Sequence, residues 1–142
     1  MPARPLFVVA LALLAACTGK GGDSDDGLPH IHIVSPADGS TVPTCLKVTV
    51  TVDNFEIVAP STDTAPTSAQ GVWDLVLNNN DNLMVPCEAL ECSLTLDGYD
   101  DGPLTVGAVL ADTTYNRLTD ASGGYVEDAA SYTLAGDDVK CP

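Results

Sequence analysis

Two histidines stand two positions apart, at His30 and His32. Residues two apart on a β-strand lie on the same face, so the two imidazoles would face one side. With a third ligand, such a pair can bind copper or zinc. No third ligand is identifiable from the sequence. The favoured interpretation is an exposed edge strand with two solvated histidines, and a copper or zinc site is the alternative.

Acidic turns form the second candidate for a metal site. Asp97, Asp100 and Asp101 cluster in one predicted turn, and Asp81 lies in the Asn-rich turn 78–82. Calcium binds about six to eight oxygen atoms, and these side chains supply oxygen. The spacing does not match an EF-hand loop, however, and Asp and Asn are favoured in turns for backbone reasons alone. The sequence therefore predicts no cofactor, with Asp97, Asp100 and Asp101 as the calcium candidates.

One of the five cysteines, Cys17, follows an uninterrupted apolar run from residue 6 to residue 16. A membrane-spanning helix needs about 20 such residues, so the run is too short to span and fits the apolar region of a signal peptide. The segment Leu14-Ala15-Ala16-Cys17 resembles the lipobox of bacterial lipoproteins. An ordinary secretory signal cleaved after Ala16 is the alternative.

The lipobox resemblance implies removal of residues 1–16 as a signal peptide and acylation of Cys17. In the lipoprotein pattern, Thr18 after the cysteine implies an outer-membrane location, on the periplasmic or the cell-surface face. Residues 17–28 are rich in glycine and acidic residues, which predicts a flexible linker between the lipid and the folded part. The expected partner at this end of the chain is therefore a membrane, bound through lipid.

Charge excludes one class of partner. The chain has 5 basic and 20 acidic residues and a formal net charge of −15. Removal of residues 1–16 takes away Arg4 and no acidic residue. Such a surface repels nucleic acid and anionic membranes, and suits solubility, cations or a basic partner. No nucleic-acid partner is expected.

The folded part is expected to be one all-β domain over residues 29–142. Its alternating apolar segments are rich in Val, Leu and Thr, which favours strands, and no stretch has the pattern of a long amphipathic helix. About seven antiparallel strands are predicted, at 30–35, 45–55, 72–78, 83–86, 92–97, 103–112 and 131–135. Two sheets packed face to face are the natural closure.

Two segments resemble bacterial immunoglobulin-like domains. In residues 31–42 a strand meets a Pro-Ala-Asp-Gly turn, and residues 101–112 with Asn116 resemble the penultimate strand of such domains and the loop after it. The resemblance covers most of residues 30–135. It implies an immunoglobulin-like antiparallel β-sandwich of about seven strands, and it is nearly silent on function.

Four cysteines remain once Cys17 carries lipid. An even number in an exported chain indicates two disulfides, and four cysteines allow three pairings. The cysteines include no Cys-x-x-Cys pair, which disfavours a zinc knuckle. If the strands follow the immunoglobulin order, Cys45 and Cys141 lie at one end, and Cys87 and Cys92 flank one turn at the other. The expected pairs are then Cys45–Cys141 and Cys87–Cys92.

Under the same strand order, loops 56–71 and 113–130 share an end with Cys87–Cys92 and with the linker. Loops on a rigid sandwich are the usual binding surface. No catalytic set is recognisable, so the sequence predicts a non-catalytic protein. The expected function is a lipid-anchored structural or protein-binding module of the cell envelope, with these two loops at a protein partner. The alternatives are a metal-binding envelope lipoprotein, for calcium or for copper and zinc, and, less favoured, a glycan-binding accessory module.

Overall fold

The computed structural model describes residues 27–63, 65–136 and 139–142. All regular structure in these residues is β-strand. None of the described residues form a helix of the length and apolar character needed to cross a membrane. The predicted signal segment 1–16 and the predicted lipid-bearing Cys17 lie outside the described residues, and so does the linker up to residue 26.

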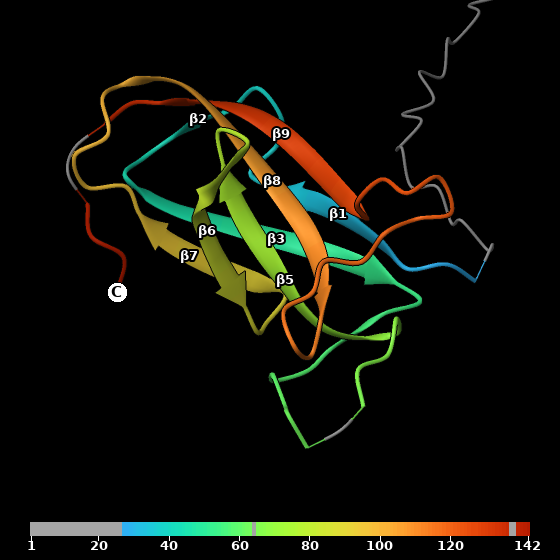
Figure 1. Ribbon diagram of the computed structural model, residues 1–142. Helices are drawn as coiled ribbons and strands as arrows, with labels where there is room; N and C mark the ends of the chain where they lie inside the picture. Colours follow the sequence, from blue (N-terminus) through green and yellow to red (C-terminus); the bar gives the residue numbers. More distant parts are fainter. Residues whose placement is uncertain (1–26, 64, 137–138) are drawn as a thin grey trace, which may run out of the picture.

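Nine strands are present in the described residues: β1 (His30–Ser35), β2 (Thr41–Val42), β3 (Cys45–Asp53), β4 (Glu56–Ile57), β5 (Gln70–Leu77), β6 (Asn80–Cys87), β7 (Glu91–Thr95), β8 (Gly102–Asp112) and β9 (Glu127–Leu134). They form a three-stranded sheet of order β1-β3-β7 and a six-stranded sheet of order β2-β9-β8-β5-β4, in which β6 pairs with β5 (Figure 1). The larger sheet curls into a half-barrel.

Alternating apolar residues build the core between the two sheets. Leu46, Val48 and Val50 of β3 are buried, while the residues between them face outward. Trp73 and Leu75 of β5 face them from the larger sheet and are also fully buried. The alternation in the sequence predicted these inward faces correctly, because a strand with one buried face has a period of two.

Two central strands are buried on both faces, which the sequence analysis did not predict. Every residue of β5 from Gly71 to Leu77 is buried, and so is β8 from Val106 to Asp112. Residues 113–126 cover part of the outer face of these two strands, because this segment turns back beside the end of β8. There Arg117 forms an isolated bridge with Ala111, and Leu118 N–H donates to the Leu110 carbonyl at 2.8 Å.

Several predicted boundaries were wrong. The expected strand at 131–135 begins at Glu127, so the expected loop 113–130 ends earlier, and residues 70–71 of the expected loop 56–71 belong to β5. The two-residue strands β2 and β4 were also missed. Each pairs in parallel with its neighbour, β2 with β9 and β4 with β5, so the sheets are not purely antiparallel. Strands this short carry too little sequence pattern to be found without their neighbours.

The chain changes sheet between β1 and β2. β1 pairs with β3 in the smaller sheet, whereas β2 pairs with β9 in the larger one. The crossing segment is held on β9: Gly39 N–H donates to the Ser131 carbonyl at 2.7 Å, and the Tyr132 hydroxyl donates to the Pro36 carbonyl at 2.9 Å. These bonds join the edges of the two sheets along one side of the molecule.

Two disulfides fasten the two ends of the fold. Cys45–Cys141 ties the C-terminal tail to the start of β3, with a Cα–Cα distance of 4.9 Å. Cys87–Cys92 joins β6 to β7, with a Cα–Cα distance of 5.8 Å. These are the two pairs that the immunoglobulin strand order predicted. Figure 1 shows the C-terminus at the end opposite to the loop that follows β4.

Candidate functional site

One end of the molecule gathers the segments that the sequence analysis singled out for binding. Residues 58–69 follow β4, residues 113–126 follow β8, and residues 27–29 lead into β1 (Figure 1). We call these three segments the loop end. The first two are joined directly, because Ser61 N–H donates to the Thr113 carbonyl at 3.2 Å. The two predicted loops therefore do lie together, with the boundaries corrected above.

The first half of segment 113–126 is shaped by Asp112. Its Oδ1 accepts from Thr114 N–H at 2.8 Å, from the Thr114 hydroxyl at 2.7 Å and from Asn116 N–H at 3.0 Å. Burial of Asp112 raises its pKa, but these hydrogen bonds to the carboxylate outweigh burial, so the pKa lies below its ordinary value. The turn places Tyr115 at a φ of 66°, which is unusual for a residue with a side chain.

The second half repeats this turn around Asp120. Its Oδ1 accepts from Ser122 N–H at 2.8 Å, from the Ser122 hydroxyl at 2.6 Å and from Gly124 N–H at 3.0 Å. Hydrogen bonds from Ser122, followed by those from the glycine backbone, lower the pKa of Asp120. The sequence pattern is Asp-x-Ser/Thr-x-Asn/Gly in both turns. Local sequence therefore fixes the shape of segment 113–126, although the sequence analysis did not single out the pattern.

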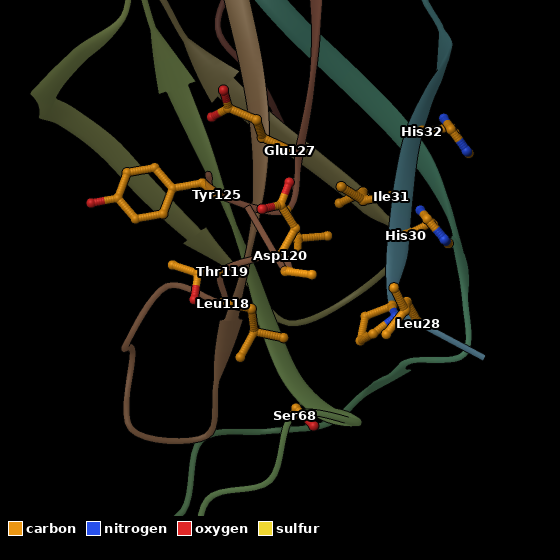
Figure 2. Close-up of a pocket in the computed structure, with 13 residues that line it drawn as sticks. Leu28, His30, Ile31, His32, Ser68, Leu118, Thr119, Asp120, Tyr125 and Glu127 are labelled. Atoms are coloured by element: carbon orange, nitrogen blue, oxygen red, sulfur yellow. The ribbon is translucent and has the colours of Figure 1, made fainter. Parts of the chain in front are cut away.

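A groove lies between β1 and segment 118–127 (Figure 2). Its cavity volume is about 330 Å³. Apolar side chains form most of the lining, and Figure 2 shows Ile31 and Leu118 pointing toward it. Ser68 of segment 58–69 closes one side. The groove thus involves all three segments of the loop end.

The two histidine candidates lie beside this groove and do not converge on it. Figure 2 shows His30 and His32 on one face of β1, as predicted, with both rings pointing away from the cavity that Ile31 enters. The Oδ2 atom of Asp128 lies 4.0 Å from His32 Nδ1. Asp128 Oδ2 also accepts from Ile33 N–H at 2.9 Å, so this carboxylate holds β1 to β9.

The acidic candidates lie at the other end. Asp97 pairs with Lys140 of the C-terminal tail at 3.7 Å, and Asp100 and Asp101 are exposed in the following turn. Within the residues that the structure describes, no group of three or more His, Cys, Asp or Glu is placed to hold a metal ion. The structure therefore brings neither the histidines nor these aspartates into a set of ligands.

A buried ion pair under segment 113–126 was missed by the sequence analysis. Arg117 Nε lies 3.8 Å from Asp74 Oδ2, and the exposed fractions of the two side chains are 15% and 2%. Asp74 Oδ1 is buried and has no hydrogen-bond partner. Burial raises the pKa of Asp74, while the positive charge of Arg117 lowers it, and burial is the larger effect.

Arg117 also stacks on Tyr125, with its Cζ atom 5.2 Å from the ring centroid, and donates to Met84 Sδ at 3.2 Å. Cavities of about 460 and 340 Å³ lie beside this pair of side chains, on the outer surface of the larger sheet. The ion pair attaches segment 113–126 to β5 and the bond to Met84 attaches it to β6, while the stack on Tyr125 joins two parts of the segment itself. Two signals could have revealed the pair: Asp74 interrupts an apolar strand, and Arg117 is the lone basic residue between Lys47 and Lys140.

No family model, no curated protein and no solved structure matches this chain.

Proposed function

We propose that this chain is a lipid-anchored protein of the bacterial outer membrane. Its folded part would be an immunoglobulin-like sandwich that acts without catalysis and binds a protein partner at the loop end. The lipobox-like segment ending at Cys17 supports the anchor. The geometry of the loop end supports binding.

The order of the strands supports the immunoglobulin-like assignment. Constant-type immunoglobulin sheets contain strands A, B and E on one side and C, F and G on the other. β1, β3 and β7 would be A, B and E, and β5, β8 and β9 would be C, F and G. β6 pairs with β5 and would be the C′ strand of the variable type. Trp73 is fully buried on β5, where immunoglobulin domains carry a buried tryptophan on strand C.

The single observation that carries the binding proposal is that the loop end is prearranged. Segment 113–126 is held by two aspartate-centred turns and by the Asp74–Arg117 pair, and it is bonded to segment 58–69. Binding by a segment that is already ordered loses less conformational entropy than binding by a mobile one. Loops on a rigid scaffold are also where binding residues concentrate.

The linker supports this use of the loop end. It joins the fold next to β1, which is part of the loop end, and its residues 17–28 can reach at most roughly 40 Å when extended. The partner surface would therefore remain close to the membrane. An envelope component near the membrane is the expected kind of partner.

Metabolic labelling with radioactive palmitate tests the anchor. The wild-type chain should incorporate label, and Cys17→Ala should not. Cys45→Ala is the matched control, because it removes a different cysteine and should still be labelled. Label in Cys17→Ala, or no label in the wild type, would refute lipidation at this residue.

Photo-crosslinking in cells tests the binding surface. A photoreactive amino acid is placed at Ser68 or Tyr115 of the loop end, and at Asp100 as the control at the opposite end. All three residues are exposed. The proposal expects a discrete crosslinked product from the two loop-end positions and none from Asp100. Equal products from both ends, or no product from the loop end, would contradict it.

A further inference from the structure

The groove of Figure 2 runs along an edge strand. β1 forms the edge of the three-stranded sheet, with β3 as its strand partner. The groove follows the chain from Leu28, two residues before β1, to His32 within it, which corresponds to a length on the order of 15 Å at the rise of a strand. Edge strands are templates for an added extended segment. The shape therefore fits about four or five residues of extended peptide.

The groove offers an apolar anchor site. Leu28 and Tyr125 line it with exposed fractions of 49% and 50%, so both side chains can contact an occupant. Between these two side chains, Ile31 and Leu118 point into the groove (Figure 2). Cavities for drug-sized ligands span about 300–1,000 Å³, so about 330 Å³ is near the lower limit and suits one or two side chains.

The charges at the groove fix the chemistry of the occupant. Asp120 and Glu127 line it together with His30 and His32, whose rings point away from it, and no lysine or arginine lines it. In the described part of the chain, Lys47, Arg117 and Lys140 each pair with a different carboxylate, those of Glu91, Asp74 and Asp97. Among the described residues, none of these three cations pairs with Asp120 or Glu127, and Asp120 Oδ2 takes no part in the hydrogen bonds that Oδ1 accepts in the turn. The net charge of −15 attracts basic partners over longer distances.

We propose that the groove binds an extended segment of the partner protein that carries a large apolar side chain next to lysine or arginine. The apolar side chain lies against Ile31 and Leu118. The basic side chains lie beside Asp120 and Glu127. This inference rests on the proposed function, because it assigns one part of the loop end to the partner.

The test is a selection of random peptides displayed on phage, with the full chain in detergent as the target. Two variants fill the groove, Ala121→Trp and Ser68→Trp. Both positions line the groove and are exposed, so the fold should tolerate the larger side chain. Peptides that bind the wild type and neither variant should be enriched in lysine or arginine beside an aromatic or large aliphatic residue.

Charge variants then test the recognition. Asp120→Asn with Glu127→Gln should weaken binding of a selected peptide about fivefold, as expected for two partly exposed ion pairs. Asn retains the oxygen that accepts in the turn around residue 120. Asp100→Asn with Asp101→Asn changes the net charge equally at the opposite end and should leave the affinity within about twofold. An equal effect of the two double variants would overturn the proposal.

Two further outcomes would also overturn it: no peptides that depend on the groove, or selected peptides without basic residues. If a fluorescent fatty acid then binds the wild type and neither tryptophan variant, the occupant is an acyl chain. The crosslink from Tyr115 separates the two proposals. Its persistence at full yield in Ala121→Trp would refute the groove assignment alone, whereas its absence from the wild type would refute the binding function as well.

Discussion

Replacing Arg117 by methionine removes the cation that lies 3.8 Å from the buried carboxylate of Asp74. Methionine retains most of the length of the side chain and its apolar contacts. The carboxylate, which is 2% exposed, is then left without its basic partner, and its Oδ1 already has no hydrogen bond. Removing one partner of a buried pair costs about 3–5 kcal/mol of unfolding free energy. We expect a loss of about 3 kcal/mol at pH 7.

The loss should shrink in acid. The pKa of Asp74 is raised in the folded protein, and removal of Arg117 takes away the opposing effect of its positive charge. Between the unfolded and the folded pKa, the native state binds more protons than the unfolded state, so stability rises as the pH falls. The slope is at most about 1.4 kcal/mol per pH unit. Because the pKa of Asp74 is raised in the wild type as well, both proteins should gain stability as the pH falls, and the variant should gain more, so its loss should be smaller at pH 5 than at pH 7.

Urea unfolding followed by tryptophan fluorescence measures this effect, because Trp73 is the single tryptophan and is fully buried. Asp74→Asn with Arg117→Met is the control. It keeps the shape of the pair and removes the carboxyl group, so it should lack the gain of stability in acid that Arg117→Met shows. An equal loss for Arg117→Met at pH 5 and pH 7, or the same pH dependence in the double variant, would refute the account of Asp74.

Three further predictions concern stability, and unfolding in urea checks each of them. Cys45–Cys141 closes a loop with a sequence separation of 96, and Cys87–Cys92 one of 5. A disulfide stabilises by lowering the conformational entropy of the unfolded chain, and more so for a longer loop. Replacing both cysteines by alanine should therefore cost about 4.7 kcal/mol for Cys45–Cys141 and about 2 kcal/mol for Cys87–Cys92. A larger loss for Cys87–Cys92 would contradict this explanation. Tyr115→Asn should raise the unfolding free energy by about 1 kcal/mol, because asparagine adopts a φ of 66° at lower cost than tyrosine. A lower unfolding free energy would show that the contacts of the tyrosine ring outweigh the relief of backbone strain. Gly71→Ala should lower the unfolding free energy by about 3 kcal/mol, because the new Cβ would clash with a carbonyl oxygen of β8. Gly107→Ala should lower it by less, because its Cβ would stay 3.7 Å from the nearest atom. Equal losses for the two variants would contradict this steric explanation.

The long strands could be predicted because their apolar residues alternate. In β3 the alternation of Val48 and Val50 with polar residues gave both the strand and its inward face. In β5 the residues around Trp73 are apolar at nearly every position. A nearly continuous apolar run is typical of a strand that is buried on both faces, but the sequence analysis used only the alternation and therefore missed the burial of the outer faces of β5 and β8.

The candidate site depends on contacts between residues far apart in the chain. His30 and His32 were singled out for their chemistry, but in the structure Ile31 between them enters the groove. The groove exists because β1 lies beside segment 118–127, and no local pattern predicts that approach. The loops could be placed at one end only after the order of the strands was assumed.

If the chain is exported, as proposed, the positions of the disulfides have a consequence for the order in which they form. When the chain emerges with its N-terminus first, Cys87 and Cys92 appear almost together. Their disulfide can therefore form before the residues of β8 and β9 have emerged. Cys45 must wait for Cys141, which follows it by 96 residues. During that interval the Cys45 thiol is open to wrong partners, Cys87 and Cys92 among them. Early closure of the short loop removes both competitors, so the order of emergence itself favours the native pairing.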